Sequence, residues 1–230
     1  MTNIKNDIVL FSSLNEIIQD LVAIDPSLQN PFYDVTGMIN RIVNSTTWNV
    51  TIKEANIPLI TDASGNSIQT NAKTTAENGS VIITFNDTYL NAATDLAVAR
   101  TMIHESMHSY FVYGLGLPLD VEYENFKVVH SLLFDKKGNP TNDQNLAQHQ
   151  QMAIRYTNQI AALLEQYAVK NNITSPVPGL SLLDYCKDLA WGGLEGTKGY
   201  RLYAPDKSRI ESNIIKENTN DPTSTQKKGC

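Results

Sequence analysis

A long apolar segment, Leu96 to about Tyr113, constrains the fold of this chain more than any other feature. Its apolar residues lie on nearly every side of a helix rather than along one stripe, so it predicts a helix that other elements cover all round. Thr94-Asp95 before it is typical of a helix N-cap followed by an acidic first-turn residue. Gly114 and Gly116 suit the C-terminus of this helix, and Pro118 prevents the helix from continuing.

Alternating and periodic patterns predict further elements. Apolar and polar residues alternate in Trp48–Lys53, and Val81–Phe85 is a short apolar run, so both segments predict strands. Residues 62–78 are rich in Ser, Thr, Asn, Ala and Gly, and they predict a loop or an exposed hairpin. An apolar stripe predicts a long amphipathic helix from Leu146 to about Lys170, and a shorter helical pattern covers Leu182–Ala190.

The length of 230 residues suits one domain with extensions. We expect a single domain over residues 1–210, which includes an N-terminal helical extension over about residues 1–45. The helical spacing of Leu14, Ile17 and Leu21 indicates that extension. Residues 211–230 are polar, and we expect them to form a flexible tail.

The composition narrows the range of possible functions. A formal charge of −6 does not favour binding to nucleic acid, which depends on basic side chains that neutralise phosphates. No apolar run approaches the ~20 residues that cross a bilayer, and the N-terminus lacks the pattern of a secretory signal, so we expect a cytoplasmic protein without a membrane partner. Cys186 and Cys230 are too few for a cysteine-based metal site, so a transition metal here requires histidine and carboxylate ligands.

The predicted buried helix contains the motif His104-Glu105-Ser106-Met107-His108, or HExxH. Residues four apart in a helix lie on the same face, so the two imidazoles can bind one Zn²⁺ at about 2.0–2.1 Å. Glu105 lies one position further round the helix, beside the metal. There it can hold a metal-bound water and accept its proton.

The apolar surroundings make this motif more informative. Two unpaired imidazoles and a carboxylate are costly in an apolar helix, and a bound metal removes that cost. In a chain with four histidines, chance alone is expected to produce about 0.003 such motifs. We therefore interpret His104, Glu105 and His108 as part of a metal site.

A third protein ligand is needed, because catalytic zinc sites usually have three protein ligands and a water. We favour His149, which follows His108 by 41 residues and lies in the first turns of the predicted long helix. His130, which follows His108 by 22 residues, is the rival. Three carboxylates are further alternatives: Glu122, Glu124 and Glu195.

Two other features are weaker candidates. Tyr156 lies two turns after His149 on the same predicted stripe, so its hydroxyl can face the metal cavity and stabilise an oxyanion, with core packing as the alternative role. The glycine-rich segment Trp191–Thr197 suits a tight loop, which either walls a cleft or is a structural turn. It lacks the strand–loop–helix context of a phosphate-binding loop, so nucleotide binding is not predicted.

The segment Thr101–Tyr110 (TMIHESMHSY) resembles the zincin metallopeptidases, in particular SprT-like proteins and related uncharacterised bacterial metallopeptidases. The resemblance covers roughly residues 79–166 and is specific only at the motif. It implies an α+β fold in which a small twisted sheet packs on the HExxH helix, with further helices around it and substrate lying extended along an edge strand. His104 and His108 match the metal ligands of this family and Glu105 matches the catalytic glutamate, whereas His149 matches the third ligand by order and context.

The chain also departs from these families. SprT-like proteins often carry a basic or cysteine-rich DNA-binding module, and this acidic chain has neither, so a role in repair of DNA–protein crosslinks is not supported. The longer metzincin motif is excluded, because no histidine follows His108 at the required spacing.

Together, the motif and the resemblance predict a zinc-dependent metallopeptidase with a peptide or protein substrate. Zinc would polarise the scissile carbonyl, and Glu105 would act as the general base. One alternative is a catalytically silent zincin-like domain with a binding or structural role, and another is a metal amidase that acts on a non-protein amide. A fourth protein ligand would favour the silent domain, and an open coordination position would favour catalysis.

Overall fold

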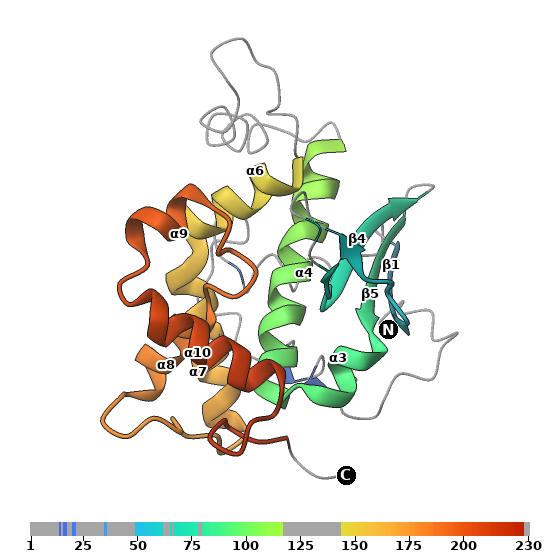
Figure 1. The fold of residues 1–230 in the computed structure, drawn as a ribbon. Coiled ribbons are helices and arrows are strands. Elements are labelled where there is room, and N and C mark those ends of the chain that lie inside the picture. The colour runs from blue at the N-terminus through green and yellow to red at the C-terminus, as the bar shows by residue number, and fades with distance from the viewer. Residues whose placement is uncertain are drawn as a thin grey trace.

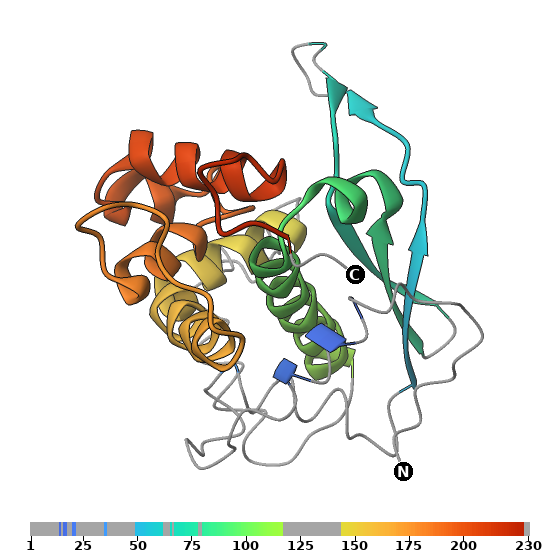
Figure 2. The same ribbon diagram turned by 90° about the horizontal axis from the view of Figure 1, so that it is seen from below.

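The computed structural model describes residues 14, 16–17, 20–21, 35, 49–61, 65, 67–77, 80–116 and 144–227. Helix α4 (Asp95–Gly116) lies at the centre of this part of the chain, between a small sheet on one side and the C-terminal helices on the other (Figures 1 and 2). Its apolar side chains point in several directions and are buried, among them Leu96, Ile103 and Phe111. The predicted helix with apolar residues on nearly every side is therefore confirmed.

The strands are β1 (Asn49–Ala55), β2 (Ile60–Thr61), β3 (Ser67–Ile68), β4 (Ala72–Glu77) and β5 (Ser80–Asn86). β5 is the middle strand of a mixed sheet, parallel to β1 and antiparallel to β4, whereas β2 and β3 form a separate antiparallel pair. Alternate residues of β5, namely Val81, Ile83 and Phe85, are fully buried, and the sheet packs on α4 through β5 and β4. The two predicted strands correspond to β1 and β5.

Residues 62–78 were predicted to form a loop or an exposed hairpin. Part of this segment, Ala72–Glu77, is strand β4, which pairs antiparallel with β5 as in a hairpin. Its six residues pair with β5 in register, with Thr74 opposite Ile83. The β-branched threonines Thr74 and Thr75 favour an extended backbone, which offsets the polar character of the segment. In the described sheet β4 is an edge strand, and Ala72, Lys73 and Thr74 line the cavity described below.

The remaining helices of the described residues are α3 (Asp87–Ala92), α6 (Gln144–Gln151), the π-helix η1 (Met152–Tyr156), α7 (Thr157–Lys170), α8 (Leu182–Leu189), α9 (Lys198–Tyr203) and α10 (Lys207–Asn218). α6, η1 and α7 follow one another without a break, which confirms the predicted long helix. α7 packs on α4 and on α8, and α10 packs on α8 (Figure 1). A small mixed sheet packed with helices is an α+β fold, as predicted.

The expectation of a flexible polar tail from residue 211 is wrong for residues up to Asn218, because these belong to α10. The helix begins at the N-cap Asp206, whose side chain accepts a hydrogen bond from the Arg209 backbone N–H. Ile210 and Ile214 are buried against the core. Only two apolar side chains point inward, so the amphipathic signal of this helix is weak in the sequence.

Glu217, at the end of α10, forms hydrogen bonds that link α8 and α10 to the start of α4. Its side chain is fully buried and accepts hydrogen bonds from the hydroxyls of Thr94, Tyr185 (2.6 Å) and Thr225 (2.7 Å). The Thr94 backbone N–H donates to the Glu217 carbonyl at 2.9 Å. Thr94 also caps α4 as predicted, because its hydroxyl accepts from the Ala97 N–H at 3.1 Å.

The described residues near the N-terminus belong to the same core. Leu14, Ile17 and Leu21 are helical and almost completely buried. Asp20 accepts hydrogen bonds from the side chains of Lys170 and Asn171 at the end of α7, both at 2.9 Å. None of the helices in the described part of the chain combines the length and the apolar character needed to cross a membrane.

The buried Tyr185–Glu217 hydrogen bond gives the first testable prediction. Tyr185→Phe keeps the ring but removes one of the donors to a buried carboxyl group, so we expect the free energy of unfolding to fall by about 1–3 kcal/mol. Urea unfolding followed by circular dichroism measures this change. The matched control is Tyr203→Phe on α9, where the side chain is 63% exposed and the expected change is within about 0.5 kcal/mol. Equal unfolding midpoints for the two variants would contradict the assigned role of Glu217.

Candidate metal centre

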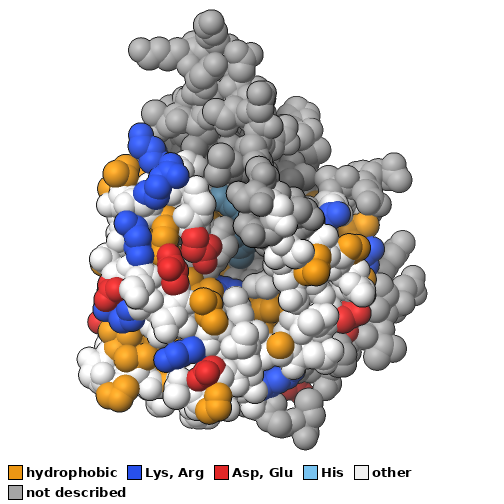
Figure 3. Space-filling view, viewed as in Figure 1, with side chains coloured by type: hydrophobic (Ala, Val, Ile, Leu, Met, Phe, Trp, Pro, Cys, Tyr) orange, Lys and Arg blue, Asp and Glu red, His pale blue; other side chains and the backbone are white. Residues whose placement is uncertain are grey.

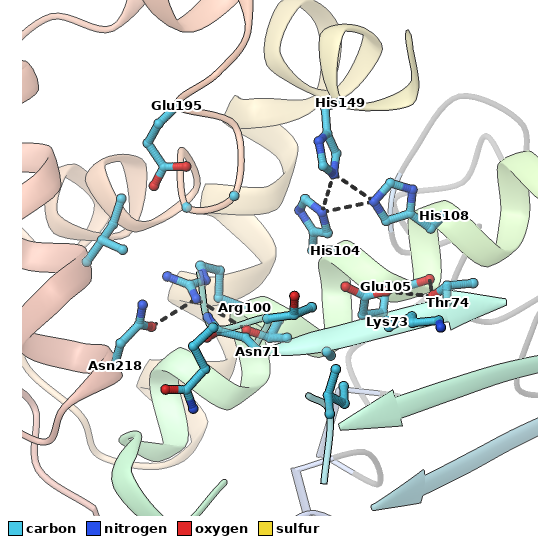
Figure 4. Close-up of a pocket in the computed structure, with 18 of the residues that line it drawn as sticks. Asn71, Lys73, Thr74, Arg100, His104, Glu105, His108, His149, Glu195 and Asn218 are labelled. Carbon is cyan, nitrogen blue, oxygen red and sulfur yellow. Dashed lines mark hydrogen bonds between the residues drawn. The ribbon is translucent and has the colours of Figure 1, made fainter. Parts of the chain in front are cut away.

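Three histidines from two helices point their rings at one another. His104 and His108 lie one turn apart on α4, and His149 comes from α6 (Figure 4). Their Nε2 atoms form a nearly equilateral triangle, with separations of 3.0 Å between His104 and His108, 3.1 Å between His104 and His149, and 2.9 Å between His108 and His149. The structure thus brings together the three histidines that the sequence selected.

The size of this triangle fits a metal ion. Ligand atoms about 2.0–2.1 Å from a tetrahedral zinc are about 3.3 Å apart, close to the separations of the three Nε2 atoms. The cluster that can hold a metal consists of these three histidines, and three protein ligands are the usual number in catalytic zinc sites. The described residues can therefore hold a metal ion.

Gln148 fixes the tautomer of His108. The Gln148 Oε1 atom lies 2.5 Å from His108 Nδ1, and because an amide oxygen only accepts, Nδ1 carries the proton. The Nε2 atom of a neutral His108 then has a bare lone pair, which faces the other two rings. Lone pairs that meet at 3 Å repel one another unless a cation lies between them, so this hydrogen bond favours metal binding.

The electrostatic environment also keeps His104 in the form that binds metals. Burial lowers the pKa of His104 well below its ordinary value, and the neighbouring His108, His149 and Arg100 lower it further. His104 is therefore neutral at pH 7, as a metal ligand must be.

Glu105 lies beside the histidines but does not join their cluster. It is almost completely buried, and its Oε2 accepts a hydrogen bond from the Thr74 hydroxyl of β4 at 2.6 Å. Burial raises the pKa of Glu105, while the nearby His108 and the hydrogen bond from Thr74 act in the opposite direction. The result is a positioned carboxyl group with a raised proton affinity next to three candidate ligands (Figure 4).

The three histidines and Glu105 line a cavity of about 990 Å³. Figure 3 shows histidine side chains at the base of a hollow between the helical side of the molecule and the sheet. Residues of β4 form one wall, and the loop after α8 forms another. A cavity of this size can hold several residues of a peptide or a small organic molecule.

Gly192 and Gly193 of the loop after α8 approach the floor of the cavity closely. A Cβ at Gly193 would lie 3.2 Å from His104 Cε1, and a Cβ at Gly192 would lie 2.4 Å from Arg100 Nη1. Gly193 also has a φ of +83°, which favours glycine. The glycine-rich segment Trp191–Thr197 is thus a wall of the cavity, the first of its two predicted roles.

Arg100 brings a buried positive charge to the same cavity. It lies on α4 one turn before His104, and its side chain is almost completely buried. Its Nη2 donates to Asn218 Oδ1 at 3.0 Å and to Thr101 Oγ1 at 3.2 Å. This arginine was not selected from the sequence.

Tyr156 does not line the cavity. It is buried and packs against Phe111 of α4, with ring centroids 6.2 Å apart. The prediction placed it on the stripe of His149 by α-helical spacing, but η1 lies between α6 and α7, and the wider turns of a π-helix shift that spacing. Its role as an oxyanion stabiliser stays a prediction.

Of the four residues considered as alternative third ligands, only Glu195 lies in the described part of the chain. Glu195 lines the cavity but is not part of the histidine cluster, and burial raises its pKa. His130, Glu122 and Glu124 lie outside the described residues.

Sequence reasoning missed Gln148, Thr74 and Arg100. Arg100 had a usable signal, because it is a charged residue in an apolar segment, four positions before His104. Gln148 and Thr74 had none, since each acts through a contact between segments far apart in the chain.

A comparison with models of protein families, with curated proteins and with solved structures finds no match to this chain.

The geometry predicts that His149 is needed for metal binding. Wild-type protein should bind close to one equivalent of zinc, measured by mass spectrometry after purification without added metal. We expect His149→Ala to lose most of this zinc, because two histidines remain, whereas His130→Ala should keep it. Loss of zinc in His130→Ala with retention in His149→Ala would move the third ligand to His130.

A further prediction concerns Gln148. Gln148→Met has a similar volume but cannot accept the His108 Nδ1 proton, so we expect zinc affinity to fall about 10–100-fold in competition with a chelator. The control is Gln150→Met on the same helix, because Gln150 accepts from the Lys198 backbone N–H and not from a histidine. Equal zinc affinity in the two variants would contradict the role of Gln148.

Proposed function

We propose that this protein is a zinc-dependent metallopeptidase. One observation carries the proposal: the Glu105 carboxyl group is held by Thr74 in the cavity that the three histidine Nε2 atoms face. A purely structural metal site has no need of a separate, positioned carboxyl group. The resemblance of the HExxH segment to zincin metallopeptidases supports the same conclusion.

The chemistry assigned to each group follows from its position. His104, His108 and His149 would hold the zinc, which when bound supplies a Lewis acid that lowers the pKa of water and polarises a carbonyl group. Hydrolysis forms a C–O bond, breaks the C–N bond and moves a proton from water to the leaving nitrogen. Glu105 accepts that proton and then donates it to the nitrogen, and its raised pKa brings its proton affinity nearer to neutral pH.

Thr74 has a positioning role in this scheme. Its hydroxyl donates to Glu105 Oε2 at 2.6 Å, which fixes the plane of the carboxyl group and leaves Oε1 to accept a proton. Because Thr74 belongs to an edge strand, the same element can also guide substrate. An edge strand has unpaired backbone groups that an extended peptide can pair with, which supports a peptide as the substrate.

Glu105→Gln tests the proposal. Gln keeps the size of the side chain but does not accept a proton, so we expect zinc to stay near one equivalent while peptide hydrolysis falls by at least ~10²-fold. The assay is digestion of denatured proteins and a peptide library, with products identified by mass spectrometry. Glu211→Gln, an exposed residue that accepts from Tyr200, is the matched control with wild-type activity expected.

Two outcomes would contradict this assignment. Equal cleavage by wild type and Glu105→Gln would show that Glu105 is not the general base. Zinc-loaded wild type that cleaves no peptide or protein would instead favour the silent binding domain or an amidase with a non-protein substrate.

A further inference from the structure

Arg100 is a buried cation that pairs with no carboxylate in the described part of the chain. Its side chain is 4% exposed, and the acceptors of its Nη2 atom, Asn218 and Thr101, are both neutral. Its Nη1 atom is buried and has no hydrogen-bond partner. Among the described residues, no Asp or Glu forms an ion pair with it.

Such an arrangement is unfavourable in the absence of a ligand. A buried charge needs a counter-charge, and a buried N–H needs an acceptor. The guanidinium group has five N–H donors in a rigid planar fork that matches the two oxygens of a carboxylate. The missing partner of Arg100 is therefore an anionic acceptor, and a carboxylate has the matching geometry.

Arg100 and the metal centre belong to the same cavity. Arg100 precedes His104 by four residues, which is about 6 Å along the axis of α4. Both side chains lie against the same pair of glycines, because a Cβ at Gly192 would meet Arg100 and a Cβ at Gly193 would meet His104. In Figure 4, Arg100 lies between Asn218 and the histidines.

The other charged groups of the cavity do not satisfy Arg100. Glu195 also lines the cavity, and the charge of Arg100 acts on it, but the two side chains form no ion pair. Burial is the largest effect on Glu195 and raises its pKa, whereas Arg100 acts in the opposite direction. Glu105 is held by Thr74 on the other side of the histidines (Figure 4). Lys73 of β4 is a second basic residue that lines the cavity.

We propose that Arg100 is the specificity-determining residue of a carboxylate-binding subsite next to the metal centre. The inference rests on the proposed function, because it assigns to that peptidase a substrate that carries a carboxylate close to the scissile bond. The carboxylate is either the C-terminal α-carboxylate of a peptide or the side chain of an Asp or Glu residue. Arg100 binds two of its oxygens, and Asn218 keeps the guanidinium group in place.

The test measures binding rather than turnover. The zinc-loaded Glu105→Gln protein is titrated calorimetrically with four probes: acetyl-Ala-Ala-Ala as the free acid, the same peptide as the C-terminal amide, acetyl-Ala-Glu-Ala-amide and acetyl-Ala-Gln-Ala-amide. We expect one acid probe to bind at least ~10-fold more tightly than its neutral counterpart. Preference for the first acid assigns the C-terminal carboxylate, and preference for the third probe assigns an acidic side chain.

Two second-site variants isolate the contribution of Arg100. Arg100→Gln should bind acid and neutral probes equally, and the exposed control Arg201→Gln should keep the discrimination. Arg100→Lys keeps the buried charge but loses the planar fork, so we expect the discrimination to fall to about 3-fold. Circular dichroism and zinc content check each variant, and Arg100→Lys decides the test if Arg100→Gln does not fold.

Titrations of zinc-free protein separate this inference from the proposed function. Zinc also binds carboxylates, whereas the discrimination by Arg100 should persist without the metal. A protein that holds zinc, cleaves nothing and still discriminates through Arg100 would contradict the peptidase but support the subsite. Three results would overturn the subsite. Arg100→Gln could still discriminate between acid and neutral probes, the discrimination could be lost when zinc is removed, or protein with Arg100 intact could show no discrimination.

Discussion

The mutual approach of three imidazoles to about 3 Å is the interaction on which the rest of the site depends. Imidazole nitrogens that face one another at this distance do not attract unless a cation or a proton lies between them, so the surrounding structure must hold the rings in position. α4 provides that support because it is packed against the sheet on one side and α7 on the other. The same packing explains the apolar character of the segment, since a helix in the middle of the molecule has little surface left for polar residues.

The polar residues that α4 does carry lie on adjacent stripes of the helix. Arg100, His104 and His108 follow one another at four-residue steps, which places them along the cavity. Two neighbouring polar residues have partners: Thr101 contacts the Tyr89 hydroxyl at 2.8 Å, and Glu105 accepts from Thr74. A buried helix tolerates these five polar residues because each has a partner or faces the cavity.

The predictable part of this molecule consists of features that depend on neighbouring residues. The spacing of His104 and His108 is fixed by helix geometry, and the strand patterns of β1 and β5 depend on alternation along the chain. His149 was predicted from the need for a third ligand, from its place in the first turns of the predicted long helix and from its order after the HExxH motif. Two features that were missed depend on tertiary contacts, namely the burial of Glu217 at the end of α10 and the contact between Thr74 and Glu105. A third is the π-helix η1, which changes the spacing between His149 and Tyr156.

Arg100 shows how burial changes the meaning of a residue type. In the sequence it is one charge in an apolar segment, and a long basic side chain on a helix commonly extends its charged end into water. The structure removes that explanation, because the loop at Gly192 covers the guanidinium group and leaves it facing the cavity. Among the described residues this cation has no ion-pair partner, and its charge contributes to the lowered pKa of His104. Burial thus turns a residue that the sequence presents as one surface charge into a donor aimed at the cavity, which is the observation behind the proposed carboxylate subsite.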